Sequence, residues 1–151
     1  MNLTRRQALA LSAGAAALAV TGLRSGAAFA DAAATDKRVM EFSGGKTPDS
    51  GKITLTAPEI AENGNTVPVS VSVKSDMTED AYVQSVMLLA EDNPNPGVAT
   101  FHFTPLSGRA EATTRMRLAK TQNVVAVAKM SDGSVFMDKK QVKVTIGGCG
   151  G

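Results

Sequence analysis

The only cysteine of the 151-residue chain, Cys149, is the residue best suited to covalent chemistry. Two glycines lie on each side of it: Gly147, Gly148, Gly150 and Gly151. Glycine has no side chain and loses much entropy when ordered, so we expect residues 147–151 to form a flexible arm. Because the residues on both sides of Cys149 have no side chains, its thiol could enter a narrow tunnel in another protein. When extended, the chain from Ile146 to Cys149 spans about 10 Å.

The beginning of the chain predicts export. Arg5 and Arg6 are followed by 17 uncharged residues, 7–23, and then by an Ala-Phe-Ala sequence that ends at Ala30. This pattern is typical of a secretory signal peptide, and the arginine pair indicates the twin-arginine route to the periplasm. We expect residues 1–30 to be removed, with cleavage after Ala34 as the alternative. Because this route generally moves folded proteins, a partner without its own signal is expected to travel with the chain.

An exposed thiol in an oxidising compartment invites disulfide formation and overoxidation, so Cys149 is better explained as a working thiol than as a frayed terminus. The arm supplies no base, no charge and no second thiol. The pKa of the thiol should therefore stay near the reference value of about 8.5, and activation must come from another protein. These residues predict a carrier, in which Cys149 accepts a covalent load and presents it to other proteins.

The composition excludes several other classes of function. Aromatic residues make up 4% of the chain and Trp is absent, so a stacking platform for nucleic acid is not expected. Without Arg5, Arg6 and Arg24 the chain has 13 basic and 14 acidic residues, which gives no drive toward nucleic acid or an anionic membrane. One histidine, His102, and one cysteine cannot form a closed zinc site within one chain, so no metal is predicted.

The segment between the leader and the arm predicts an all-β domain. In residues 31–50, Ala32 to Phe42 favours a short helix that Gly44-Gly45 would end. From residue 51 to residue 146, apolar and polar residues alternate with period two, and turn residues separate the runs. About seven short strands with this spacing predict an immunoglobulin-like β-sandwich.

The last part of this domain leads into the arm. Asp132-Gly133 predicts a tight turn, after which Val135 to Met137 returns as a hairpin strand. Lys139-Lys140 is expected to interrupt the final strand at a bulge or an exposed edge. We expect Val142 to Ile146 to be an edge strand that feeds the arm and contacts a partner.

The arm sequence Gly147-Gly148-Cys149-Gly150-Gly151 resembles the carboxy-terminal signature of the SoxY family, the sulfur carriers of the bacterial thiosulfate-oxidising (Sox) system. The twin-arginine leader is similar as well, and the similarity runs over most of residues 40–151. The interior segments that resemble the family are residues 57–64 (Ala-Pro-Glu-Ile-Ala-Glu-Asn-Gly), 67–69 (Val-Pro-Val), 93–96 (Asn-Pro-Asn-Pro) and 121–124 (Thr-Gln-Asn-Val).

The resemblance implies a covalent sulfur carrier with an immunoglobulin-like sandwich and no cofactor of its own. It implies a heterodimer with a SoxZ-like subunit and transient contacts with three enzymes. A SoxXA-like haem enzyme would couple thiosulfate to Cys149, a SoxB-like hydrolase would remove sulfate, and a SoxCD-like molybdenum and haem enzyme would oxidise the remaining sulfur. Thiosulfonate and sulfane sulfur would be the groups carried on Cys149.

Two other functions remain open at this point. A ubiquitin-like sulfur donor would use the carboxylate of Gly150-Gly151, but it needs activation in the cytoplasm and does not need Cys149. An exported immunoglobulin-like binding module would use Cys149 to form a disulfide with its partner. Replacing Cys149 by Ser separates the three, because it abolishes loading in the first, leaves the second intact and breaks a reducible dimer in the third.

Overall fold

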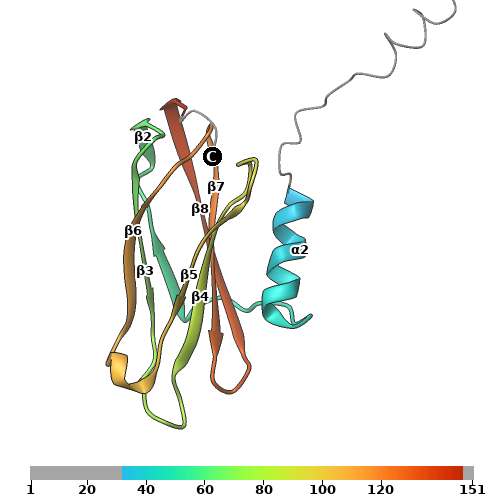
Figure 1. Ribbon diagram of the computed structural model, residues 1–151, viewed down its shortest axis with the longest axis vertical. Coiled ribbons are helices and arrows are strands. Elements are labelled where there is room, and N and C mark those ends of the chain that lie inside the picture. Colours follow the sequence, from blue (N-terminus) through green and yellow to red (C-terminus); the bar gives the residue numbers. More distant parts are fainter. Residues whose placement is uncertain (1–31, 148–151) are drawn as a thin grey trace, which may run out of the picture.

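The computed structural model describes residues 32–147, which form two β sheets packed face to face with one α helix alongside (Figure 1). This confirms the all-β, immunoglobulin-like sandwich predicted from the sequence, with eight strands where about seven were expected. In chain order the elements are α2 (Ala32–Ser43), β1 (Ile53–Thr56), β2 (Ile60–Asn63), β3 (Val67–Val73), β4 (Val83–Ala90), β5 (Gly97–His102), the 3-10 turn η1 (Pro105–Ser107), β6 (Ala110–Met116), β7 (Gln122–Met130) and β8 (Val135–Ile146).

The smaller sheet contains three antiparallel strands in the order β1-β3-β6. Its central strand, β3, alternates between buried valines and more exposed residues, as the period of two predicts. The buried residues are Val67, Val69, Val71 and Val73. One face of this sheet therefore packs into the sandwich, and the other faces solvent.

The larger sheet has five strands in the order β2-β8-β7-β4-β5. Two of its inner strands, β4 and β7, are buried along almost their whole length rather than at alternate residues. The reason is that both faces of this sheet are covered, one by the smaller sheet and the other by α2. Continuous apolar runs are typical of strands that are buried on both faces.

Helix α2 lies against the outer face of the five-stranded sheet (Figure 1). Val39 and Phe42 of the helix pack on a cluster from β4, β7 and β8, which comprises Met87, Leu89, Val125, Val127, Val135 and Met137. The helix forms where the sequence favours one and ends at two glycines with positive φ, Gly44 at 67° and Gly45 at 84°. The Gly45 amide donates to the carbonyl of Met40 over 2.8 Å.

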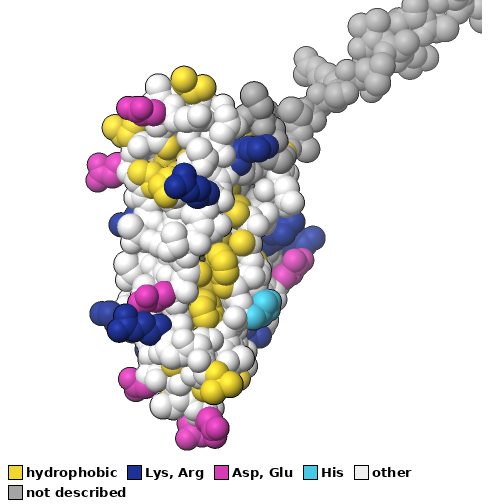
Figure 2. Space-filling model, turned by 60° about the vertical axis from the view of Figure 1, so that its left-hand side comes forward, with side chains coloured by type: hydrophobic (Ala, Val, Ile, Leu, Met, Phe, Trp, Pro, Cys, Tyr) yellow, Lys and Arg dark blue, Asp and Glu magenta, His cyan; other side chains and the backbone are white. Residues whose placement is uncertain are grey.

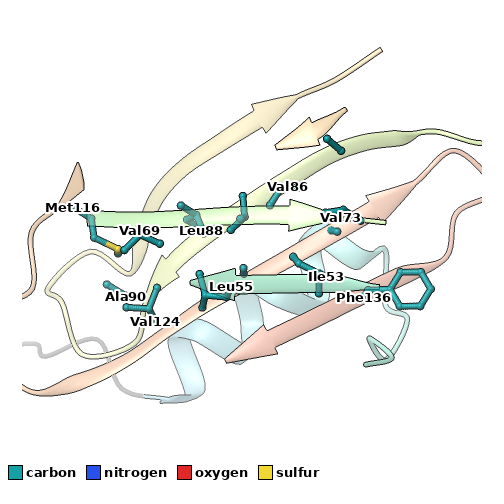
Figure 3. Close-up of a cluster of buried hydrophobic side chains, with 14 of the residues drawn as sticks. Ile53, Leu55, Val69, Val73, Val86, Leu88, Ala90, Met116, Val124 and Phe136 are labelled. Carbon is teal, nitrogen blue, oxygen red and sulfur yellow. The ribbon is translucent and has the colours of Figure 1, made fainter. Parts of the chain in front are cut away.

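The main core lies between the two sheets (Figure 3). Leu55 and Val69 from the smaller sheet face Leu88 and Val124 from the larger one, and Met116 fills the space at one end. All five side chains are at most 3% exposed. Burying each such side chain stabilises the fold by about 1.5–3 kcal/mol, so this core is what keeps the two sheets together.

Strand β8 differs from the prediction for the end of the domain. It is one continuous strand of 12 residues, so the interruption expected at Lys139-Lys140 is wrong. Lys139 pairs with Val125 and Lys140 with Val124, without a shift in register. Both lysine side chains are exposed, and backbone pairing with β7 holds the strand together there.

Strand β2, which the sequence did not reveal, pairs in parallel with the end of β8. The segment Val142 to Ile146 is therefore not an edge strand, and that expectation is wrong. β1 and β2 follow each other closely in the chain but belong to different sheets, so residues 57–59 cross from one sheet to the other. The Leu55 amide on β1 donates to Oδ2 of Asp138 on β8 over 2.8 Å, which links the two sheets beside this crossing.

Candidate functional site

Only one of the residues that the sequence singles out for function lies within the described part of the chain. Gly147 is described, at the end of β8. The others lie outside the described residues: Arg5, Arg6, Gly148, Cys149, Gly150 and Gly151. The structure therefore describes the base of the arm and not the thiol. We call this base the root of the arm and define it as Ile146, Gly147 and the residues that are hydrogen-bonded to them or packed on them.

One side of the root is held by β2. Asn63 pairs with Ile146, and two further pairs precede it, Ala61 with Val144 and Ile60 with Lys143. Just beyond β2, the amide of Gly64 donates to the carbonyl of Ile146 over 2.8 Å. The backbone of β8 is thus hydrogen-bonded up to its last residue.

The other side of the root is held by a threonine. The last pair between β7 and β8 is Gln122 with Val142, so β7 does not reach the final residues of β8. Thr121 continues the contact with its side chain, because its Oγ1 accepts from the amide of Val144 over 2.9 Å and donates to the carbonyl of the same residue over 3.5 Å. The end of β8 is therefore held from both sides.

Gly147 lies in close contact with the loop between β6 and β7. A Cβ placed on residue 147 would lie 2.2 Å from the carbonyl oxygen of Ala119, and real Cβ contacts essentially never fall below 3.0 Å. The neighbouring atom belongs to the backbone, so it cannot turn away as the end of a long side chain can. Glycine at position 147 is thus required for packing at the root, in addition to any freedom that it gives to the arm.

Two buried amide side chains fix the loop against which Gly147 packs. Asn93 is 5% exposed and Gln122 is 3% exposed. Oδ1 of Asn93 accepts from the amide of Ala119 (3.0 Å) and from Nε2 of Gln122 (2.8 Å), and its Nδ2 donates to the carbonyl of Arg117 (2.8 Å). Gln122 in turn donates to the carbonyl of Lys120 over 3.2 Å. Arg117, Ala119 and Lys120 of this loop are therefore hydrogen-bonded to the amide pair.

A charged cluster lies next to the amide pair, where β4 ends. The Glu91 carboxylate accepts from Nδ2 of Asn123 and from Nζ of Lys139, the latter over 3.1 Å. Burial opposes ionisation of Glu91, but the hydrogen bonds from Asn123 and Lys139 and the charge of Lys139 outweigh it, and together they lower the pKa of Glu91 below its ordinary value. This cluster links the residue that follows β4 to strands β7 and β8 of the larger sheet.

The structure brings together segments that are far apart in the sequence and that carry the family resemblance. Asn63 and Gly64 close the segment 57–64, Asn93 opens the segment 93–96, and Thr121 and Gln122 open the segment 121–124. All of them meet at the root of the arm. Polar residues at strand ends are the only sequence signal for this role, and sequence reasoning did not assign it to them.

Metal-ligating groups and membrane-spanning helices are two further features that bear on the function of the described residues. Within residues 32–147 no group of three or more His, Cys, Asp or Glu side chains lies close enough to hold a metal ion. His102 is exposed on the edge strand β5, as expected for a strand residue. No helix in the same part of the chain has the length and hydrophobicity to cross a membrane.

The chain is similar to a known protein family and to solved structures. The family model described as "Sulfur oxidation protein SoxY" matches residues 39–149, a range that includes Cys149. The solved structure of the sulfur carrier protein SoxY from Chlorobium limicola f thiosulfatophilum is 32% identical, with a TM-score of 0.62, and the match covers 73% of this chain and 90% of that one. No curated protein matches the chain.

Further solved structures share the fold alone. A superoxide reductase (neelaredoxin) from Ignicoccus hospitalis is 22% identical, with a TM-score of 0.55 over 62% of this chain and 80% of that one. A putative superoxide reductase from Thermotoga maritima is 15% identical, with a TM-score of 0.53 over 68% of this chain and 89% of that one. The family model and the identity to the Chlorobium protein go further than a shared fold, and they show that this chain belongs to the SoxY family of sulfur oxidation proteins.

Proposed function

We propose that this protein is a sulfur carrier that holds sulfur intermediates covalently on Cys149 and presents them to partner enzymes. The observation that carries the proposal is the family match, which extends through residue 149 and thus includes the only cysteine of the chain. The 32% identity to a protein described as a sulfur carrier supports it. So does the root of the arm, which anchors the backbone two residues before the thiol.

The chemistry of loading is an oxidative coupling. The Cys149 thiolate and the sulfane sulfur of thiosulfate form an S–S bond, and two electrons pass to the haem enzyme that catalyses the step. The product is a cysteine S-thiosulfonate. The arm contains no base that activates the thiol, so the partner enzyme supplies the deprotonation and the electron acceptor.

The chemistry of release is a hydrolysis. Water attacks the terminal sulfonate sulfur, sulfate leaves, and Cys149 keeps the sulfane sulfur as a persulfide. A hydrolase performs this step, and a molybdenum and haem enzyme oxidises the remaining sulfur before a second hydrolysis. The protein itself has no turnover. Its covalent bond keeps reactive intermediates from diffusing away and delivers an already attached substrate to each enzyme.

The proposed partners are those that the resemblance implies: a SoxZ-like subunit in a heterodimer, and SoxXA-like, SoxB-like and SoxCD-like enzymes in transient contact. Arg5 and Arg6 would direct the folded chain through the twin-arginine route to the periplasm, with its partner subunit bound. Sulfur intermediates on Cys149 are the only cofactor-like groups in this proposal.

The test is the intact mass of the mature protein from cells grown on thiosulfate, measured with and without reductant, beside the matched variant Cys149→Ser. We expect a reductant-sensitive gain of a thiosulfonate group or of sulfur atoms, located in the last peptide and absent from the variant. Normal thiosulfate oxidation by cells that carry only Cys149→Ser would disprove the carrier role.

The same measurement separates the binding-module alternative. A species of twice the monomer mass that collapses on reduction, with no sulfur added to the monomer, would indicate a disulfide-tethered module instead. The mass also fixes the cleavage site, since removal of residues 1–30 and removal of residues 1–34 give different masses.

A further inference from the structure

The thiol of Cys149 is tied to the folded domain by a short tether. β8 ends at Ile146, and Gly147 packs against the carbonyl oxygen of Ala119. Two extended residues beyond Gly147 span about 7 Å between Cα atoms, and the Sγ atom lies about 3 Å further on. So short a tether cannot average out a shift at its origin. A displacement of Gly147 therefore displaces the whole volume that the thiol can reach.

The contacts around the root of the arm form a closed ring. The amide of Gly64 donates to the carbonyl of Ile146 over 2.8 Å, and the carbonyl of Gly64 accepts from the amide of Leu118 over 2.7 Å. Ala119 follows Leu118 and packs on Gly147, which follows Ile146. Each part of the ring rests on the next, so a shift of the loop at Ala119 is passed on to the start of the arm.

One buried side chain fastens this ring to the loop between β4 and β5, which lies at the same end of the sandwich as the end of β8 (Figure 1). Oδ1 of Asn93 accepts from the amide of Ala119 over 3.0 Å, and its Nδ2 donates to the carbonyl of Arg117 over 2.8 Å. Ala119 thus lies between Asn93 and Gly147. The position of the first glycine of the arm depends on Asn93 through this residue.

Asn93 is itself held in place. The proline rings of Pro94 and Pro96 restrict the backbone of the loop that carries it. The amide of Asp92 donates to Oε1 of Gln122 over 2.8 Å, and Nε2 of Gln122 donates to Oδ1 of Asn93 over 2.8 Å. The side chain of Asn93 is therefore a fixed support, tied to the start of β7, and it can hold Ala119 in one place.

The surface of the sandwich offers no electrostatic guide for the arm on the face shown in Figure 2. Side chains of both charges are scattered there from one end of the molecule to the other, and hydrophobic side chains form a broken band along the middle. A surface steers a charged group only where one sign of charge is concentrated. On this face, the placement of the thiol therefore relies on the root of the arm and on the residues that hold it.

We propose that Asn93 is a positioning residue for the carrier reaction. Through Ala119 it sets the point and the direction from which the arm leaves the sandwich, and so the place where Cys149 meets the reacting atoms of a docked enzyme. The inference rests on the proposed carrier function and adds to it a residue that governs the reaction without touching the substrate. A misplacement of about 1 Å can lower the rate of a positioned reaction about a hundredfold.

The test is the loading of thiosulfate onto Cys149 by the haem enzyme, followed by mass spectrometry over a range of carrier concentrations. Asn93→Ala should lower kcat about tenfold or more and leave KM within about twofold, because the thiol is misplaced after docking while the outer surface is unchanged. Asn93→Asp keeps the shape and both acceptor positions but loses the donor to Arg117, so it should lower kcat about threefold. It carries the same comparison if Asn93→Ala does not fold.

Val73→Ala is the matched control for a loss of stability alone. Val73 is 5% exposed, in the core between the sheets, and it pairs with Ala110 at the end of β3 away from the root. The substitution weakens the same domain and leaves the loops around the root intact. Measured at a temperature at which circular dichroism shows all variants folded, Val73→Ala should load with the kcat and KM of the wild type.

A small aromatic disulfide reagent provides the second control, because its reaction with Cys149 needs no docked geometry and should be equally fast in all variants. If this reaction slows in the Asn93 variants, if their KM rises while kcat is unchanged, or if Val73→Ala lowers kcat as much, the positioning role is disproved while the carrier function stands. The same holds if the Asn93 variants load like the wild type. If the wild-type protein takes no load from the enzyme, the carrier function fails and this inference fails with it.

Discussion

The carbonyl oxygen of Ala119 occupies the space in which a side chain on Gly147 would begin. The distance from that oxygen to a Cβ at position 147 would be 2.2 Å. Ala119 cannot easily withdraw, because its amide is hydrogen-bonded to Asn93 over 3.0 Å. The first glycine of the arm is therefore part of the folded domain, and it sets the point from which the arm departs.

Replacing Gly147 by Ala should displace the root of the arm. The added methyl group cannot fit against the Ala119 carbonyl, so the end of β8 must shift, and overpacking of this kind costs about 1–3 kcal/mol where the structure cannot relax. The hydrogen bond from the Gly64 amide to Ile146 should weaken first. We expect faster hydrogen exchange at the Gly64 amide, measured by nuclear magnetic resonance.

Gly97→Ala is the matched control for this prediction. There, a new Cβ would lie 2.4 Å from Nη1 of Arg38, but that atom is the end of a flexible side chain and can move away. Hydrogen exchange at Gly64 should remain at its wild-type rate. Equal protection of this amide in wild type and Gly147→Ala would show that the contact with Ala119 does not hold the root.

Asn93→Ala should destabilise the fold and loosen the loop that supports Gly147. The substitution leaves the amide of Ala119 and the carbonyl of Arg117 without this partner and removes one of the two acceptors of Nε2 of Gln122. Buried groups that lose their hydrogen bonds cost about 1–3 kcal/mol each, and relaxation reduces the sum, so we expect a loss of about 2–4 kcal/mol in the free energy of unfolding. Urea denaturation measures it.

The control for Asn93 is its neighbour Asn95→Ala. Asn95 is exposed, and its side chain accepts from Arg38 and from the amide of Gly97. Its removal should cost about 1 kcal/mol or less. Similar losses for the two variants would contradict the role given to the buried pair of Asn93 and Gln122.

The ionised form of Glu91 should stabilise the fold only above acidic pH. Burial opposes its ionisation, while hydrogen bonds from Asn123 and Lys139 and the charge of Lys139 lower its pKa below the ordinary value of 4.5. A carboxylate whose pKa is lower in the folded state contributes stability that is fully present above pH 4.5 and is lost as the pH falls through the folded-state pKa. The melting temperature of Glu91→Gln should therefore approach that of the wild type as the pH is lowered.

The pH series needs a carboxylate without such partners for comparison. Glu62→Gln, at an exposed position on β2, should follow the wild-type profile throughout. A constant difference between Glu91→Gln and the wild type, at neutral and at acidic pH alike, would show that the Glu91 charge is not stabilised by Asn123 and Lys139.

Thr35→Val should stabilise the protein. Thr35 lies on α2 and is 1% exposed, and its Oγ1 is buried without a hydrogen-bond partner in the described structure. Valine has the same shape and removes the buried hydroxyl, which costs about 1–3 kcal/mol when unpaired, so we expect a gain of about 1 kcal/mol in the free energy of unfolding.

Thr54→Val, at an exposed position on β1, provides the matched control for Thr35. It should change the stability by less than about 0.5 kcal/mol, because its hydroxyl is already in contact with water. A loss of stability in Thr35→Val would contradict this prediction, because it would show that the Thr35 hydroxyl makes a stabilising interaction in the folded protein.

Local patterns were sufficient to predict much of this protein. The alternating valines of β3 predict a strand with one buried face, because side chains of a strand alternate between two faces. The pair Gly44-Gly45 ends α2 because glycine adopts positive φ without strain. The proposed chemistry of the arm depends only on residue types, so Cys149 and its glycine neighbours are recognised as the candidate site from the sequence. The family resemblance is also recognised from the sequence, and the family model confirms it.

The elements that the sequence misjudged depend on partners far away in the chain. Ile60 to Asn63 has little strand character of its own and becomes β2 by pairing with Lys143 to Ile146. Lys139 and Lys140 do not interrupt β8, because pairing with β7 maintains the strand through exposed charged residues. Strand pairing is decided by the arrangement of the whole sheet, and no local pattern records it.

The sequence by itself determined which residue is proposed to carry the chemistry, because a lone thiol among glycines is a matter of residue type and spacing. Only the tertiary structure decided where the root of the arm, which precedes that residue, lies on the sandwich. Gly64, Asn93 and Thr121 are separated by tens of residues, and they meet at the root of the arm because the fold brings the ends of β2, β4 and β8 close to the start of β7. Contacts between distant segments form only when the core between the sheets closes, which is why the position of the root of the arm could not be predicted from the residues alone.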